Sequence, residues 1–236
     1  MNHSIKNVLI VGGGSSGWMA AAMLARFFSK QIQIQLVESS EIGTVGVGEA
    51  TIPPIRTFND VLGIKEADFL KQTMGSIKLG IQFENWNQPG DSYMHAFGEI
   101  GRNLGIAGFH HYWLKARDAG VAEDFWRYSL NEQAARHNRF APMETIPGTQ
   151  FPGLTHAYHL DAGLYAQMLR AYSEKLGVKR IDGKIQTVDK DSESGDIAAV
   201  QLESGERLEA DLFIDIQAAE DVLRRPGDPL GAAGDQ

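Results

Sequence analysis

Three glycines near the start of the chain have the spacing of a nucleotide-binding turn. Gly12-x-Gly14-x-x-Gly17 separates an apolar, β-branched run (residues 5–11) from a segment of helix-forming residues (18–28). In such a turn the first glycine permits the tight bend, the second lets the backbone approach a pyrophosphate, and the third lets helix and strand pack closely. The phosphates then meet free N–H groups at the positive end of the helix dipole.

An acidic residue completes this pattern. The run 32–38 alternates between apolar and polar residues and predicts a second strand, which ends at Glu38. A carboxylate at this place can accept hydrogen bonds from the hydroxyls of a nucleotide ribose. Because strand, turn, helix, second strand and acid follow in order, we interpret the segment as a dinucleotide site rather than a simple glycine turn.

One lysine lies on a strand of strictly alternating character. In the segment IKLGIQFENW, Ile77, Leu79, Ile81 and Phe83 fall on one face, and Lys78 falls on the polar face, pointing away from the core. A solvated surface lysine is one interpretation. The other is an ammonium that faces an internal passage, where it can donate a hydrogen bond or, once deprotonated, act as a nucleophile.

The composition restricts the function further. The chain has 236 residues, 43% of them hydrophobic, and a net charge of −8, so we expect a folded protein that binds neither nucleic acid nor acidic membranes. It has no cysteine, no basic, apolar leader and no long apolar segment, which fits a cytoplasmic protein without disulfides. No H-E-x-x-H pattern accompanies His110, His111, His156 and His159, and we expect no metal site.

The remaining elements give an α/β fold class. After an irregular segment 39–54 the pattern predicts helices at 55–62, 66–74, 109–119, 122–137 and 162–176, and strand-like runs at 178–181, 184–188, 197–203 and 207–216. The late runs form a β-meander that returns to the sheet, which favours FAD over NAD, because NAD-binding Rossmann domains continue with alternating helices and strands. We expect an FAD-binding Rossmann-like sheet of the glutathione-reductase type.

The domain organisation follows from the same pass along the chain. Residues 1–216 are predicted to form the FAD-binding domain, with an incomplete substrate-side insertion over about 52–160. From residue 217 the composition changes to glycine, proline and few large apolar residues, which predicts a divergent, disordered tail over 217–236.

At this level of detail the sequence resembles the flavin-dependent halogenases of the tryptophan halogenase family. The resemblance rests, in order, on VGGGSSGWMAAA, VGVGEATIPPI, IKLGIQFENW, MHAFG with HHYW, AYHLDAGLYAQML and LEADLFID. It covers residues 5–215, and six such stretches in the right order are far more specific than the glycine motif alone.

The resemblance implies a chemistry. FAD, supplied in reduced form by a separate flavin reductase, reacts with O₂ and oxidises chloride or bromide to hypohalous acid. The oxidant then travels inside the protein to tryptophan or another indole, and the lysine at position 78 captures or orients it. An oligomeric state, such as a homodimer, is not fixed by the resemblance.

The resemblance also assigns site residues. His95 and Phe97 match positions that contact the indole, Phe97 by stacking, although either residue could instead fill the core. The segment 39–50 matches a strap over the flavin, and Ile185 matches a backbone contact to the adenine side. The expected flavin contacts are Gly12, Gly13, Gly14, Ser16, Gly17, Glu38, Ser39, Ile42, Val45, Val47, Gly48, Glu49, Ala50 and Ile185.

The chain departs from the family pattern near its end. After LEADLFID the family continues with a cysteine, a small residue and a glycine, whereas this sequence reads Ile216-Gln217-Ala218. The W-x-W-x-I-P signature and the family's catalytic glutamate are absent, which predicts an N-terminal part truncated or frameshifted near Asp215. Two alternatives stay open: an FAD-dependent monooxygenase that hydroxylates its substrate, and a non-catalytic nucleotide-binding remnant.

Overall fold

The computed structural model describes residues 4–41, 50–103 and 105–216, which form two compact units. The first unit contains residues 4–41 and 161–216, and the second contains residues 50–160 without residue 104. The predicted tail 217–236 lies outside the described residues. In the described part of the chain, no helix has the length and apolar character needed to cross a membrane.

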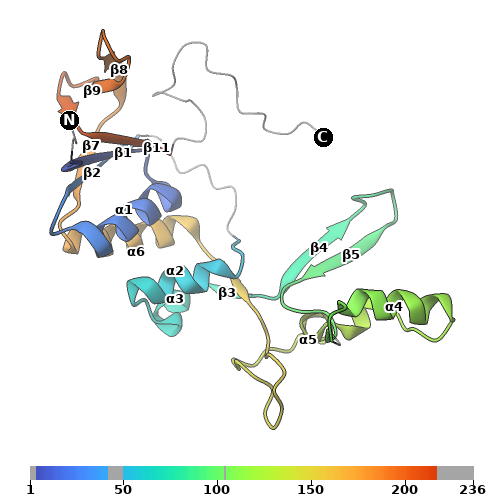
Figure 1. Ribbon diagram of the computed structural model, residues 1–236. Helices are drawn as coiled ribbons and strands as arrows, with labels where there is room; N and C mark the ends of the chain where they lie inside the picture. Colours follow the sequence, from blue (N-terminus) through green and yellow to red (C-terminus); the bar gives the residue numbers. More distant parts are fainter. Residues whose placement is uncertain (1–3, 42–49, 104, 217–236) are drawn as a thin grey trace. The chain divides into compact units, whose positions relative to one another are not determined.

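The first unit is built in three layers (Figure 1). A parallel sheet of strand order β11-β1-β2-β7 forms the middle layer, helices α1 and α6 cover one face, and the antiparallel sheet β10-β9-β8 covers the other. This arrangement confirms the predicted α/β, Rossmann-like fold with a β-meander. The elements are β1 (Asn7–Val11), α1 (Gly14–Phe28), β2 (Gln33–Glu38), α6 (Ala162–Lys175), β7 (Lys179–Asp182), β8 (Ile185–Lys190), β9 (Ile197–Leu202), β10 (Arg207–Glu209) and β11 (Leu212–Asp215).

Side-chain alternation in the middle sheet explains the layers. Leu9 and Val11 of β1 pack with Val37, Ile181 and the meander residues Val200, Leu202 and Leu208 in one buried cluster. On the helix side, α1 buries Gly17, Trp18 and three alanines, whose small size lets the helix lie close to the sheet. The β1–α1 connection is therefore fixed by packing on both faces of the sheet.

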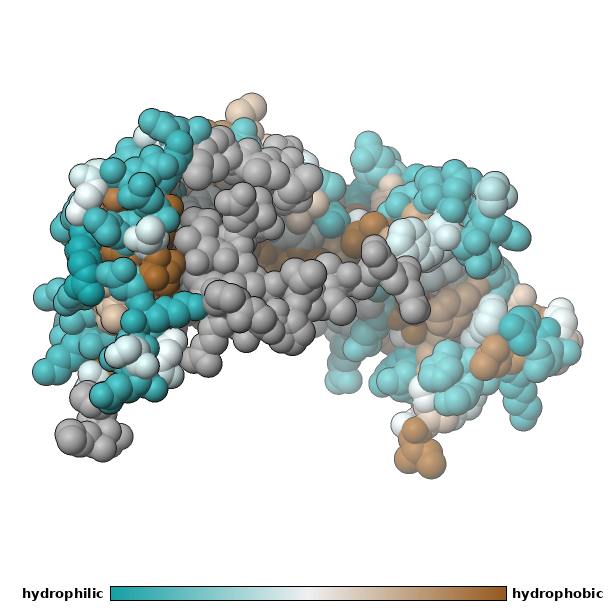
Figure 2. Space-filling model, turned by 90° about the horizontal axis from the view of Figure 1, so that it is seen from above, coloured by the Kyte–Doolittle hydropathy of each residue, from teal (hydrophilic) through white to brown (hydrophobic). Residues whose placement is uncertain are grey.

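The second unit combines helices with two short antiparallel ladders. Strand β3 pairs with β6, and β4 pairs with β5. The elements are α2 (Pro54–Leu62), α3 (Glu66–Gln72), β3 (Ser76–Lys78), β4 (Gly80–Glu84), β5 (Ser92–Ala96), α4 (Phe109–Asp118), a 3₁₀ helix (Phe125–Tyr128), α5 (Leu130–Arg136) and β6 (Ala157–His159). Figure 2 shows apolar residues interrupting the hydrophilic surface of this unit, which exposes Met74, Trp86, Ile106 and Val121.

The structure corrects several predicted elements. The run 77–84 is not one strand but breaks at Leu79 into β3 and β4, which belong to different ladders. The run 207–216 likewise divides into β10 and β11, and β7 joins the parallel sheet rather than the meander. The predicted helix 122–137 is interrupted at Ser129, whose hydroxyl accepts the N–H of Glu132 and caps α5.

The break at Leu79 has a polar cause. The Leu79 carbonyl accepts the N–H of Phe97 at 2.8 Å and the Asn131 amide at 3.2 Å, and the Asn131 side chain also bonds both backbone groups of Thr155. Asn131 is buried, so these bonds replace the water that its amide and the strand ends lose on folding. One side chain thus joins the β3–β4 break to the start of β6.

The face of β6 turned toward α3 carries a buried polar cluster. Glu66 accepts hydrogen bonds from Tyr158 Oη at 2.7 Å and interacts with His156 Nε2 at 2.6 Å. Burial alone raises the pKa of Glu66, but the bonds from His156 and Tyr158 and the charges of His156 and Arg56 outweigh this effect and hold the pKa below its usual range. The anionic carboxylate therefore ties α3 to β6.

Because the folded state lowers the pKa of Glu66, this carboxylate stabilises the fold above its ordinary pKa of 4.5, and the stabilisation is lost as the pH falls. We expect Glu66→Gln to lower the melting temperature at about pH 7 and to do so progressively less below about pH 4.5. Thermal melts of both proteins across this range measure the difference.

Asp68→Asn, an exposed acid on the same helix, is the matched control and is expected to change the melting temperature little at any pH. If Glu66→Gln lowers the melting temperature by the same amount from neutral to acidic pH, the stabilising role assigned to the Glu66 carboxylate is contradicted.

Candidate functional site

The glycine turn of the first unit has the backbone that a nucleotide site needs. Gly12 and Gly14 have φ values of 103° and 70°, which side chains other than glycine rarely adopt. Helix α1 begins at Gly14 without a side-chain cap and without an acidic residue in its first turn. Its first N–H groups and the positive end of its dipole are therefore available to an anion.

Two further glycines, Gly17 of the motif and Gly13 between its first two glycines, leave room for close packing. A Cβ at Gly13 would lie 1.6 Å from Glu38 Oε2, and a Cβ at Gly17 would lie 2.1 Å from the Gly12 carbonyl oxygen. Gly17 therefore allows α1 to pack on β1, and Gly13 allows the Glu38 carboxylate to reach the turn. The residues present fit a pyrophosphate at the helix end and a ribose beside the carboxylate.

Glu38 is held by two residues that the sequence pattern did not identify. Arg180 Nε donates to Glu38 Oε1 at 2.7 Å, and Trp18 Nε1 donates to Glu38 Oε2 at 3.2 Å. The hydrogen bond with Glu38 raises the pKa of Arg180, although its partial burial acts in the opposite direction. Arg180 also lies 3.5 Å from Asp182. Each oxygen of the carboxylate accepts one of these two donors and can accept another from a ligand.

The other residues expected to contact the flavin differ in their exposure and in their hydrogen bonds. Ser16 is exposed in the first turn of α1, and Ser39 accepts the N–H of Glu41 directly after β2. Ser40 N–H donates to Asp182 at 2.9 Å, a bond that lowers the pKa of Asp182. Ile185 opens β8, with its side chain packed against the sheet core. The predicted contacts Ile42, Val45, Val47, Gly48 and Glu49 lie outside the described residues.

Lys78 is buried, with an exposed fraction of 8%, so of the two interpretations of its strand position the solvated surface lysine is excluded. The Lys78 Nζ lies 5.7 Å from the centre of the Phe97 ring, a cation–π geometry. Burial lowers the pKa of Lys78. Among the described residues, no carboxylate forms an ion pair with this ammonium.

The structure brings one of the two predicted substrate contacts to Lys78. Phe97 is buried, and its N–H donates to the Leu79 carbonyl, so its ring is fixed beside the lysine. His95 is exposed on β5, where Met94 and Ala96 point inward on the opposite face. Within the second unit, Phe97 therefore lies beside Lys78. The His95 side chain lies on the face of β5 opposite to Met94 and Ala96.

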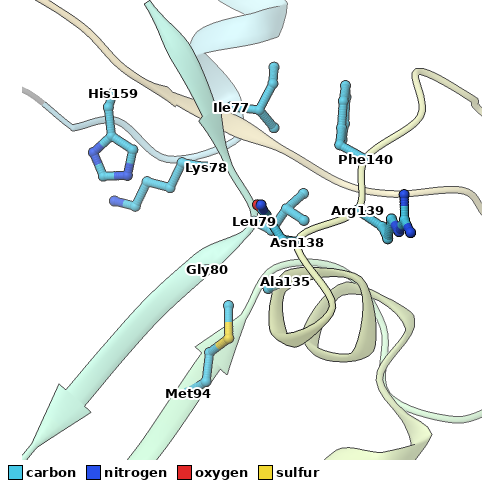
Figure 3. A pocket seen from close by; sticks show the side chains of 10 residues that line it. All are labelled: Ile77, Lys78, Leu79, Gly80, Met94, Ala135, Asn138, Arg139, Phe140 and His159. Carbon is cyan, nitrogen blue, oxygen red and sulfur yellow. The ribbon is translucent and has the colours of Figure 1, made fainter.

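A cavity of about 290 Å³ lies at the junction of β3, β4 and the end of α5 (Figure 3). Leu79, Met94 and Ala135 contribute apolar walls, and Lys78, Asn138 and His159 contribute polar groups. Lys78 and His159 lie on one side of β3, with the amine extended toward the imidazole, whereas Ile77 and Phe140 lie on the other side. The volume is near the lower end of the range for small-molecule sites.

Comparison with known proteins relates the chain to one family. Residues 7–223 match the tryptophan halogenase family. The chain is 32% identical to the tryptophan 7-halogenase RebH of Lentzea aerocolonigenes and to the tryptophan 6-halogenase SttH of Streptomyces toxytricini, over 94% and 92% of its length. It spans 44% of the length of each of these curated relatives.

Solved structures show the same relationship. The flavin-dependent halogenase Xcc4156 from Xanthomonas campestris is 51% identical, with a TM-score of 0.81 over 89% of this chain and 42% of that one. The flavin-dependent halogenase BrvH from Brevundimonas sp. BAL3 is 44% identical, with a TM-score of 0.80 over the same shares. On the strength of the match over residues 7–223 and of these likenesses, the chain belongs to the tryptophan halogenase family.

Proposed function

We propose that this chain carries the FAD-binding and oxidant-handling part of a flavin-dependent halogenase. The observation that carries the proposal is Lys78, a buried cation that faces an aromatic ring and, within the described residues, lacks a carboxylate partner. Such a charge is costly to bury and is typical of functional sites. Its presence in a member of this family supports a role in handling an oxidised halogen.

The glycine turn is proposed to hold the FAD dinucleotide. The α1 N–H groups bind the pyrophosphate, Gly14 allows its close approach, and Glu38 accepts the ribose hydroxyls. Arg180 and Trp18 hold the Glu38 carboxylate in place for this contact. Ser16, Ser39, Ala50 and Ile185 are proposed as further contacts of the cofactor. Bound in reduced form, FAD would supply two of the four electrons that O₂ takes up, and a halide ion would supply the other two and become hypohalous acid.

Lys78 is proposed to control where the oxidant reacts. As an ammonium it donates a hydrogen bond to hypohalous acid, and as a neutral amine it offers a lone pair to the halogen. The lowered pKa increases the neutral fraction at a given pH. Phe97 shields the amine from water on one side, and we assign tryptophan or another indole as the final acceptor. A separate flavin reductase is the proposed source of reduced FAD.

The cofactor assignment is tested by binding. We expect FAD to raise the melting temperature of the wild-type chain, with a stabilisation of about 2.7 kcal/mol at 100 times the dissociation constant. Gly13→Ala should weaken FAD binding about tenfold or more, because the added methyl group displaces the Glu38 carboxylate. Equilibrium dialysis with FAD measures both affinities.

Gly163→Ala in the first turn of α6 is the matched control, since its methyl group meets only Asp161 Oδ1 at 3.2 Å. We expect it to leave FAD affinity unchanged. A wild-type chain that neither binds FAD nor gains thermal stability from it would rule out the proposed cofactor and with it the halogenase function.

The role of the lysine is tested by its product. With reduced FAD, O₂, chloride or bromide and tryptophan, we expect the wild-type chain to form halotryptophan, detected by mass spectrometry. Lys78→Met should lower this product at least a hundredfold while FAD affinity is kept, because Met preserves the shape of the side chain but not its amine.

Lys71→Met, at an exposed position of α3, is the control and should leave product formation unchanged. Hydroxylated tryptophan in place of halotryptophan would overturn the proposal in favour of a monooxygenase. Tight FAD binding without any product would instead indicate a nucleotide-binding remnant.

A further inference from the structure

His159 lies on the same face of the β3–β6 ladder as Lys78. In the antiparallel register Ser76 is opposite His159 and Lys78 is opposite Ala157, so Lys78 and His159 are diagonal neighbours with side chains on one face. Diagonal pairs of this kind are within reach of long and aromatic side chains. Both residues line the same cavity, and Figure 3 shows the lysine amine extended toward the imidazole ring.

The two side chains differ in their access to water. Lys78 is buried, whereas His159 is exposed in the described structure. The backbone of His159 pairs with Ala50 on one side of β6 and with Ser76 on the other, which fixes the position of its Cα. His159 therefore places an imidazole that solvent can reach on the face that carries the buried amine.

Among the described residues, the other titratable or charged groups near this face lack an acceptor atom, are bound elsewhere or face away. Arg139 lines the cavity but is a cation without an acceptor atom. His156 faces the opposite side of β6 and is bound to Glu66. Asp161 follows two residues after His159 and accepts the N–H of Leu164 at 2.8 Å. His95 is exposed on β5, away from Met94.

We propose that His159 is the proton acceptor of Lys78: it takes a proton from the buried ammonium and exchanges it with solvent, so that the amine can react with an electrophilic halogen. The proposal rests on the proposed function and names a second residue of the same site. Imidazole is suited to this role because it accepts and releases protons near neutral pH.

The Lys78 ammonium transfers a proton to His159, and the lysine nitrogen lone pair forms an N–halogen bond while the halogen–oxygen bond of hypohalous acid breaks. His159 passes that proton to solvent and is neutral again. The departing hydroxide takes the second proton from the halogenated amine nitrogen and leaves as water.

The proposal is tested without flavin, by carbamylation of lysines with potassium cyanate. This small reagent reacts only with a neutral amine, and peptide mass spectrometry gives the ratio of Lys78 to exposed Lys71 within one sample. We expect His159→Ala to lower this ratio about tenfold near pH 7, because general-base assistance is lost. Added imidazole should restore the ratio in His159→Ala and leave the wild-type ratio unchanged.

His159→Gln, which keeps a polar side chain of similar length, guards against a folding defect in the alanine variant and should show the same loss. His110→Gln, on the exposed face of α4, is the control and should keep the wild-type ratio. An unchanged ratio in the two His159 variants, or a loss that imidazole does not restore, overturns the proposal. Because labelling needs neither FAD nor halide, its outcome is independent of whether the chain halogenates.

Discussion

The register between β3 and β6 is the constraint on which the second unit depends. Side chains alternate between the two faces of a strand, so a slip of one residue exchanges the faces completely. With Lys78 opposite Ala157, one face carries Lys78 and His159, and the other carries Ile77 and Tyr158. A slipped β6 would turn Tyr158 away from Glu66 and leave that carboxylate without its donor. The register thus places the polar cluster of Glu66 on one face of the ladder and the Lys78 amine on the other.

In the first unit the corresponding constraint is the close approach of the backbone to a side chain. The turn that begins α1 comes so close to β2 that a methyl group at Gly13 would overlap the Glu38 carboxylate. Arg180 on β7 and Trp18 on α1 hold this carboxylate from two further elements. A ribose bound there would therefore meet an acceptor whose position is fixed before binding, which lowers the entropy lost on association.

The sequence could predict features that depend on neighbouring residues. The glycine turn, the flanking strand and helix, and Glu38 follow from short spacings, and the first unit has the predicted fold. The pairs that fix the sites are distant along the chain: Arg180 meets Glu38 across 142 positions, and His156 meets Glu66 across 90. The local periodicity of a sequence does not reveal contacts between residues so far apart. The alternation of 77–84 was real, but it could not show that Asn131 ends the first ladder at Leu79.

The burial of Lys78 decides between the two interpretations that its alternating strand left open. An alternating pattern assigns its polar positions to water, because burying an ammonium without a carboxylate costs free energy. The fold accepts this cost at Lys78, where the Phe97 ring offsets part of it and burial lowers the pKa of the amine. Local rules fail most often where a residue is placed for chemistry rather than for stability. In this chain the strand position that departs from the pattern is Lys78, the residue on which the proposed function rests.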